Sequence, residues 1–494
     1  MKRDYAKLGI GGLASKILGG VREILLARYF GTGQVADAYR ASLSVTLSPA
    51  HLVTTRVIQT CFIPLYARYS TGEREKGWAL FQSLLLLFLV LGTALGVLLF
   101  LFAGPIIGAI LRGFDPDRAA LAVRMLRIMA IGVPFYVYSS VLGALGSAQR
   151  DFVIPAVRPG LQNLCMLILI VAAALSGRPA LAAFGFTAAY ALLSLYATAH
   201  LLRRNRLPIR PSLDRGLVRE VWARLWELLR PLVFLSFLVE AGVLIERAVA
   251  SLLGPGRVAA VDYARYVTET VHFLLAVPIG IIGLSVFANL SEEEMRLKID
   301  RILSLLAIAI LPLSAFLLLN GRDVLAVLYM RGRFDATSLH LTERALWGFS
   351  IGLWAFSASY SLQRILNARM RNAVVLRAET LAIVVNAAVL FLLYRRLGVF
   401  VIGLGVTLGS IGSLLAYLSY LRISLPLTKK SVATALLAMP LYLLLAWAGL
   451  RLLGRGLGPL VLQSLFVFLF WSAVVFSFKD LRRLVLDQIG GGGR

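Results

Sequence analysis

Residues 84–102 read LLLLFLVLGTALGVLLFLF, and this run of nineteen residues without a charge decides the class of fold. An α-helix rises 1.5 Å per residue, so about 20 apolar residues span the ~30 Å hydrocarbon core of a bilayer. Residues 435–450 are apolar on every face in the same way. A transmembrane β-barrel would instead show short strands of alternating polarity. The sequence therefore predicts an all-α polytopic membrane protein.

The composition agrees with this class. Of the 494 residues, 59% are hydrophobic and 15% are charged, and the formal net charge is +26. Soluble chains carry about 25% charged residues. The cations lie mostly at the ends of apolar runs, where Lys and Arg set membrane topology. We therefore expect membrane lipids as neighbours and no nucleic acid partner.

The apolar segments predict about 14 transmembrane helices. An even number places both termini on one side, and the basic ends MKR and KDLRR mark that side as cytoplasmic. We therefore expect a multi-pass protein of the cytoplasmic (inner) membrane with both termini in the cytoplasm. The predicted spans are 8–30, 37–68, 79–103, 119–148, 152–176, 180–202, 231–253, 258–289, 300–319, 341–368, 374–396, 398–422, 431–452 and 457–478.

The second half of the chain repeats a motif of the first. The sequence GTGQVA at 31–36 precedes Asp37, and GPGRVA at 254–259 precedes Asp262. Six predicted spans separate the two copies, so the halves are parallel repeats, which commonly enclose a central cavity. The predicted organisation is an N lobe at 1–203, a cytoplasmic amphipathic linker at 204–230, a C lobe at 231–424, and a last segment at 425–494. Each lobe has six helices, and the last segment holds two extra helices and a cytoplasmic tail.

Ionisable residues inside the predicted spans carry the functional signal, because each costs about 2.5–3.5 kcal/mol at the centre of a membrane helix unless it faces a cavity or a partner. At 100° per residue, one polar stripe runs along the second span and another along the eighth. The first stripe comprises Asp37, Arg40, Ser44, Ser48, His51 and Thr55, and the second Asp262, Arg265, Glu269 and His272. The first span adds Lys16, Arg22, Glu23 and Arg28.

Two interpretations of these charges are open. A cavity with an excess of guanidinium groups suits a large anion bearing phosphate, because Arg offers a planar, permanently charged fork to phosphate oxygens. Alternatively, the charges form structural ion pairs between helices, such as Asp37 with Arg40, Arg265 with Glu269, or Glu246 with Arg247.

The chain resembles the MviN/MurJ lipid II flippases of the multidrug/oligosaccharidyl-lipid/polysaccharide exporter superfamily. The resemblance rests on the run SKILGGVREILLARYFG at 15–31 with Asp37 after it, on LGSAQRDFVIP at 145–155, and on RGRF at 331–334. It extends over nearly the whole chain. It implies two six-helix lobes, an added helix pair that forms a groove for a lipid tail, and a transporter and not an enzyme.

The resemblance also implies the substrate and the residues that bind it. The substrate would be the undecaprenyl-pyrophosphate-linked peptidoglycan precursor lipid II, moved from the cytoplasmic to the outer leaflet by alternating access. Lys16, Arg22, Arg28 and Asp37 match family positions. The adjacent arginines usual in the second span fall on Ala50 and His51, and the arginine usual in the eighth falls on Tyr266. Arg56 and Arg265 are the neighbouring cations that would replace them. The complete predicted substrate-binding set is Lys16, Arg22, Arg28, Asp37, Arg40, Arg56, Arg265 and Glu269.

The residues leave open the coupling ion and the exact substrate. We expect a monomer and no required cofactor, with sodium coupling as an option for which Glu240, Asn386 and Thr407 offer oxygen ligands. Another polyprenyl-linked glycan is an alternative substrate. A cation-coupled small-molecule exporter of the same superfamily is an alternative function, although an excess of Arg would repel cationic substrates.

Overall fold

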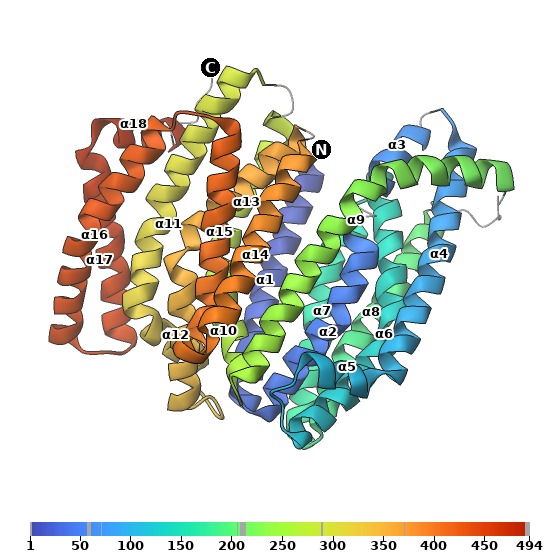
Figure 1. Ribbon diagram of the computed structural model, residues 1–494, viewed down its shortest axis with the longest axis horizontal. Helices are drawn as coiled ribbons and strands as arrows, with labels where there is room; N and C mark the ends of the chain where they lie inside the picture. The colour runs from blue at the N-terminus through green and yellow to red at the C-terminus, as the bar shows by residue number, and fades with distance from the viewer. Residues whose placement is uncertain are drawn as a thin grey trace. The chain divides into compact units, whose positions relative to one another are not determined.

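The computed structural model describes residues 2–56, 61–70, 72–204, 206–207, 214–287, 290–369 and 371–489. Within these ranges it describes all side chains apart from those of residues 2–14, 53, 55–56, 215, 228–235, 279–287 and 487–489. Every regular element in this part of the chain is a helix (Figure 1). The predicted all-α class is confirmed.

Contacts between residues divide the chain into unit 1, Met1–Ala259, and unit 2, Ala260–Arg494. Helix α10, Arg257–Phe287, begins in unit 1 and continues in unit 2. The other elements of unit 1 are α1 (Lys2–Phe30), α2 (Gln34–Arg56), α3 (Ile63–Ser70), α4 (Arg74–Leu101), α5 (Ala103–Ile110), α6 (Pro116–Ala148), α7 (Val153–Leu175), the short 3₁₀ helix η2 (Pro179–Ala183), α8 (Phe184–Arg203) and α9 (Arg215–Leu252).

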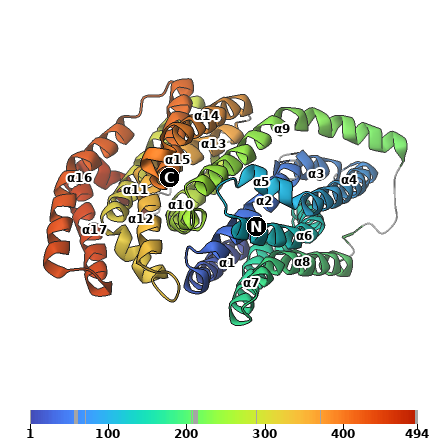
Figure 2. The same cartoon turned by 60° about the horizontal axis from the view of Figure 1, so that its bottom comes forward.

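The regular elements of unit 2 are also all helices in its described residues. Its elements after α10 are α11 (Glu292–Tyr329), α12 (Ala336–Ile351), α13 (Leu353–Ala368), α14 (Asn372–Leu397), α15 (Phe400–Leu421), α16 (Pro426–Leu453), α17 (Leu457–Ser477) and α18 (Lys479–Ile489). Helices α16 and α17 lie side by side in both views (Figures 1 and 2). They are the predicted extra pair.

Each predicted span corresponds to helix in the described part of the chain, with differences at two places. The span predicted at 37–68 is helical to Arg56 and again from Ile63, where α3 begins. The span predicted at 341–368 is two helices, α12 and α13, that meet at Gly352. Glycine is a poor helix former because its backbone loses the most freedom on folding, and hydropathy alone does not register this.

Several helices begin at side chains that accept hydrogen bonds from the first turn. Asp115 accepts from the backbone N–H of Arg118 at the start of α6, where Pro116 is the first helical residue. Ser291 and Glu294 form a reciprocal capping box at the start of α11. Such caps satisfy N–H groups that have no partner within the helix. These caps start α6 and α11 a few residues before the apolar runs that the sequence predicts as spans.

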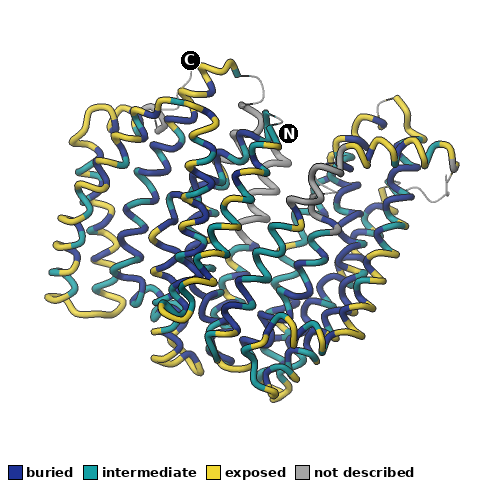
Figure 3. The backbone as a smooth tube through the Cα atoms, in the orientation of Figure 1, coloured by how far each residue is buried: buried dark blue, intermediate teal, exposed yellow. Residues whose placement is uncertain are grey.

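Nine helices in the described part of the chain are long and apolar enough to cross a membrane. Helices α1 and α2, which the sequence predicts as the first and second spans, are outside this set, and each carries several charged residues. The outer surface of the extra pair is the opposite case, because Leu437 and Leu452 are 81% and 86% exposed there (Figure 3). Apolar side chains at this exposure suit contact with lipid. The chain is an all-α polytopic membrane protein, and the charged residues of α1 and α2 need a partner or a cavity away from lipid.

Helix α9 is continuous across the predicted boundary between the linker and the C lobe. It runs from Arg215 to Leu252 and packs against α2, α4 and α5. These contacts place it in unit 1, although the sequence repeat assigns residues 231–253 to the second half. The domain limits at 203, 230 and 424 remain predictions.

Glycine permits a close approach between α12 and α15 in unit 2. A Cβ atom on Gly403 would lie 2.3 Å from the backbone nitrogen of Phe349, and one on Gly348 would lie 2.4 Å from the carbonyl oxygen of Phe400. Small residues let membrane helices approach closely, and dispersion then holds them together.

We predict that Gly403→Ala lowers the stability of the purified protein by about 1–3 kcal/mol, because the added methyl group forces α12 and α15 apart. Thermal unfolding in detergent measures this change. The matched control is Gly458→Ala in α17, where a Cβ atom meets nothing within 4 Å. Equal melting temperatures for the two variants would contradict the prediction.

Candidate functional site

A buried carboxylate in α1 joins three helices of unit 1. Glu23 is 3% exposed and accepts from Arg22 at 2.7 Å, and it also pairs with Arg40 of α2. The other terminal nitrogen of Arg22 donates to Oδ1 of Asn163 in α7 at 2.9 Å. The Asn163 amide in turn donates to the carbonyl oxygen of Ser15 at 3.0 Å. Two predicted site residues, Arg22 and Arg40, are thus brought together around one carboxylate.

A second buried carboxylate, Asp37, lies near the start of α2 and is fully buried. Its Oδ2 atom accepts from the backbone N–H of Gly256 at 2.6 Å, and its Oδ1 atom accepts from Ala259 at 2.9 Å. Gly256 directly precedes α10 and Ala259 lies in its first turn, where the positive end of the helix dipole favours an anion. Asp37 therefore caps α10 from another helix.

Arg118 of α6 completes the Asp37 cluster. Its Nη1 atom lies 3.3 Å from Oδ2 of Asp37, and its Nε atom donates to Oδ2 of Asp115 at 2.6 Å. The backbone N–H of Arg118 and then its guanidinium group lower the pKa of the Asp115 carboxyl. The sequence suggested Asp37 with Arg40 as a structural pair. The structure pairs Asp37 with Arg118 and Arg40 with Glu23, and the Asp-Pro-Asp-Arg start of α6 is the signal that could have indicated Arg118.

The remaining predicted cations of unit 1 differ in exposure. Lys16 is half-buried, and Arg28 is exposed with its guanidinium 5.9 Å from the ring centroid of Tyr29. The side chains of Arg56 and Thr55 lie outside the described residues. The substrate-binding roles of this set remain predictions.

The polar stripe of α2 is largely packed inside unit 1. Arg40 and Ser48 are buried, like Asp37. His51 is partly exposed, with its Nδ1 atom 3.5 Å from Oε1 of Glu240 in α9 and its ring centroid 5.9 Å from that of Tyr136 in α6. Packing against α1, α6 and α9 thus accounts for much of the polarity that the helical periodicity indicated.

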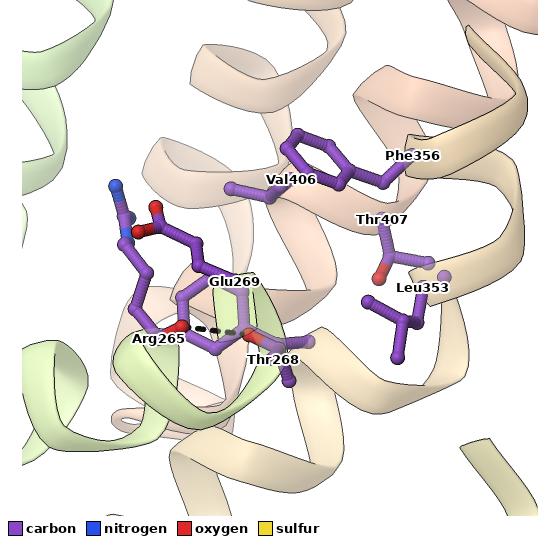
Figure 4. A pocket seen from close by; sticks show the side chains of 9 residues that line it. Arg265, Thr268, Glu269, Leu353, Phe356, Val406 and Thr407 are labelled. Atoms are coloured by element: carbon purple, nitrogen blue, oxygen red, sulfur yellow. Dashed lines mark hydrogen bonds between the residues drawn. The ribbon is translucent and has the colours of Figure 1, made fainter. Parts of the chain in front are cut away.

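In unit 2, a small pocket of about 60 Å³ brings together Arg265, Glu269 and Thr407 (Figure 4). The Arg265 and Glu269 side chains extend from α10 in the same direction, and the Thr268 hydroxyl donates to the carbonyl oxygen of Arg265 at 3.0 Å. The Arg265 guanidinium lies 5.2 Å from the ring centroid of Phe349. Three residues predicted for two different roles therefore line one pocket.

The residues predicted to bind sodium are distributed over both units. Glu240 belongs to unit 1, whereas Asn386 and Thr407 belong to α14 and α15 of unit 2. The Thr407 hydroxyl donates to the carbonyl oxygen of Gly348 at 2.7 Å. A Cβ atom on Gly405 would lie 2.2 Å from Oδ1 of Asn386, which places that amide against α15. The sodium site remains a prediction.

An apolar groove of about 540 Å³ also lies in unit 2. Helices α11 and α17 supply most of its lining, including Pro312, Phe316, Phe468 and Trp471. Such a groove can hold a hydrocarbon chain. It lies beside the extra helix pair, for which the resemblance implied a groove for a lipid tail.

The fold defines the chain as a polytopic helical membrane protein. It superimposes with a TM-score of 0.69 on the inward-facing conformation of a multidrug resistance MATE family transporter of the MOP superfamily, at 15% identity, over 84% of this chain and 96% of that one. With a structure described as lipid II flippase MurJ in an inward closed conformation, the TM-score is 0.82 at 18% identity, over 96% of this chain and 99% of that one.

Residues 26–471 match the sequence model of the family described as lipid II flippase MurJ, and the chain belongs to this family. A curated relative, the probable lipid II flippase MurJ of Buchnera aphidicola subsp. Acyrthosiphon pisum, is 26% identical over 382 residues, which are 72% of this chain and 72% of the relative. The resemblance noted from the sequence is confirmed.

We predict that Asp37→Asn destabilises the start of α10 by about 1–3 kcal/mol, because the amide can accept at one atom only and its NH₂ group faces a backbone donor. Hydrogen exchange at the amides of Gly256 and Ala259 should become faster, and the melting temperature should fall. Asp117→Asn, an exposed change in the first turn of α6, is the control. Unchanged exchange at the two amides would show that the cap does not stabilise α10.

Proposed function

We propose that this protein moves lipid II, the undecaprenyl-pyrophosphate-linked peptidoglycan precursor, from the cytoplasmic to the outer leaflet of the inner membrane. The proposal includes a multi-pass monomer with both termini in the cytoplasm. It involves translocation only and no covalent chemistry. The family match over residues 26–471 supports the substrate.

The observation that carries this proposal is the cationic interior of unit 1. Arg22 and Arg40 both contact the single carboxylate of Glu23, and they lie on α1 and α2, which are too polar to face lipid throughout. A pyrophosphate brings about two negative charges, which guanidinium groups bind through charge-assisted hydrogen bonds. The apolar groove between α11 and α17 would hold part of the polyprenyl chain.

The proposed mechanism is alternating access, in which the two lobes expose the headgroup site first to one leaflet and then to the other. When the inside of the cell is negative, outward movement of an anionic headgroup is electrically favourable. It lowers the free energy by about 2.3 kcal/mol per charge per 100 mV. Two charges therefore gain about 4–5 kcal/mol, and no ATP is needed for this direction.

We predict that Arg22→Ala and Arg28→Ala abolish the ability of the protein to support cell-wall synthesis in a strain depleted of its own flippase. Each change removes a cation that matches a family position in the first span. Growth of the depleted strain and native mass spectrometry of the lipid that copurifies measure the effect. Arg124→Ala, an exposed change on α6, is the control.

Full activity of both variants would exclude the proposed role of these two arginines. Purified protein that moves a cationic dye in liposomes, and binds no polyprenyl pyrophosphate, would instead support the small-molecule exporter.

We further propose that the membrane potential drives transport and that sodium is not required. In proteoliposomes with an inside-negative potential, lipid II translocation should persist when choline replaces sodium and should slow when the potential is removed. Loss of translocation without sodium would contradict this proposal. It would direct attention to Glu240, Asn386 and Thr407 as ligands.

A further inference from the structure

A further cation, Arg158 of α7, lies in the interior of unit 1. No carboxylate in the described part of the chain lies within ion-pair distance of it. Its guanidinium carbon lies instead 4.8 Å from the ring centroid of Tyr136 in α6 and 5.4 Å from that of Tyr190 in α8. Helices α6, α7 and α8 pack together in unit 1 (Figure 2). Aromatic rings thus take the place that a carboxylate has beside Arg22, Arg40 and Arg118.

The two rings are themselves held in place. Their centroids are 4.8 Å apart in an edge-to-face arrangement, and Phe186 of α8 packs 4.9 Å from the ring of Tyr190. The Tyr190 hydroxyl donates to Oε1 of Gln162 in α7 at 2.8 Å. Because this proton points to Gln162, the Tyr190 oxygen can accept from Arg158, which hydrogen-bonds to the hydroxyls of both Tyr190 and Tyr136.

A cation held by aromatic faces differs chemically from one held by a carboxylate. The ring quadrupoles attract the guanidinium charge, and the two neutral hydroxyls accept from only part of its five N–H groups. A carboxylate, by contrast, occupies the same two donors that would bind a phosphate. Arg158 therefore has no neutralising carboxylate among the described residues, and some of its N–H groups remain to bind an anionic ligand.

Arg158 lines a cavity of about 250 Å³ in unit 1, which is far larger than the ~10–15 Å³ that one water needs. Four residues with hydroxyl groups also line this cavity, namely Thr54 of α2 and Ser139, Ser140 and Ser147 of α6. Each of these hydroxyls now donates to a carbonyl oxygen of its own helix, at 2.7–3.0 Å. A hydroxyl rotates freely, so each can donate to an anion instead.

The cavity lies at the end of unit 1 where α6 passes into α7. Ser147 is the next-to-last residue of α6, and Ile154, another lining residue, is the second of α7. Four spans, α1, α2, α4 and α6, precede this end, so it lies on the same face of the membrane as the N-terminus. With the proposed orientation, that face is cytoplasmic and is where lipid II begins its passage.

We propose that Arg158 and the hydroxyls of this cavity form a binding site for the phosphate groups of the polyprenyl-linked substrate. The proposal rests on the proposed function, and it adds a site that the polar stripes did not indicate. The ligand chemistry is that of a phosphate or pyrophosphate group. Its source is the lipid headgroup, as opposed to a free anion from the cytoplasm.

The test compares Arg158→Gln, which removes the charge, with Arg158→Lys, which keeps it. Arg127→Gln is the matched control, because Arg127 is an exposed arginine of α6 that also lies over a ring, 5.9 Å from Phe100. Each purified protein in lipid nanodiscs is titrated with undecaprenyl pyrophosphate, undecaprenol and inorganic pyrophosphate. Melting temperatures are recorded alongside.

We expect Arg158→Gln to weaken undecaprenyl pyrophosphate binding about ten- to a hundredfold, with undecaprenol binding unchanged. Arg158→Lys should recover part of the affinity, and Arg127→Gln should match the wild type. Equal affinity of Arg158→Gln and wild type for undecaprenyl pyrophosphate would overturn the site. Lost affinity for inorganic pyrophosphate alone would assign the cavity to a soluble anion, and this too overturns it.

Two further outcomes separate this site from the proposed function and from a structural role. A wild-type protein that binds none of the phosphate ligands would overturn the proposed function itself, and the site with it. If Arg158 only supports the packing of Tyr136 and Tyr190, all ligands including undecaprenol should weaken in parallel with a fall in melting temperature. Arg158→Lys would then give no selective recovery for the pyrophosphate.

Discussion

The cost of placing a charge in an interior surrounded by lipid governs this structure. Such a charge needs a compensating partner, because an isolated ion in a medium of low dielectric loses its hydration and forms no interaction that offsets the loss. Unit 1 meets this requirement in three ways. Asp37 takes backbone N–H groups of α10 and the guanidinium of Arg118, Glu23 takes two guanidinium groups, and Arg158 takes two aromatic rings. The first two solutions neutralise a charge with an opposite charge, whereas the third holds the Arg158 charge with neutral tyrosines.

The Asp37 cluster explains the repeated motif GTGQVA at 31–36 and GPGRVA at 254–259. Gly256 has a φ of +81°, and a Cβ atom on it would lie 2.6 Å from the carbonyl oxygen of Thr32. The turn before α2 and the turn before α10 are therefore in contact, and only glycine fits at that contact. Because the turns touch, Asp37 of the first copy reaches the first N–H groups of α10 in the second. The repetition is visible in the sequence, but the contact between its copies is not.

The sequence predicted much of the fold and a smaller share of the site. Apolar runs predict where the spans lie. A segment inside the bilayer must satisfy its own backbone hydrogen bonds, and for such a run the helix does so. Helical periodicity also identified Asp37 and Arg40 as groups that avoid lipid. It could not identify their partners, because Arg118 and Glu23 come from other helices. The break between α12 and α13 at Gly352 was not predicted, because a hydropathy average over many residues does not register one glycine.

Arg158 shows most clearly what one-dimensional patterns leave out. The family resemblance indicated that α2 lacks its usual arginines, with Ala50 and His51 in their place, but it named no replacement on a neighbouring helix. In the structure His51 contacts the ring of Tyr136, and Arg158 of α7 lies over that same ring. A guanidinium group on α7 can thus supply positive charge beside α2, where the usual arginines are missing. A transporter must also release its ligand. A cation held by neutral tyrosine rings suits that need, because water can take over its donors when the anion leaves, with no buried ion pair to break.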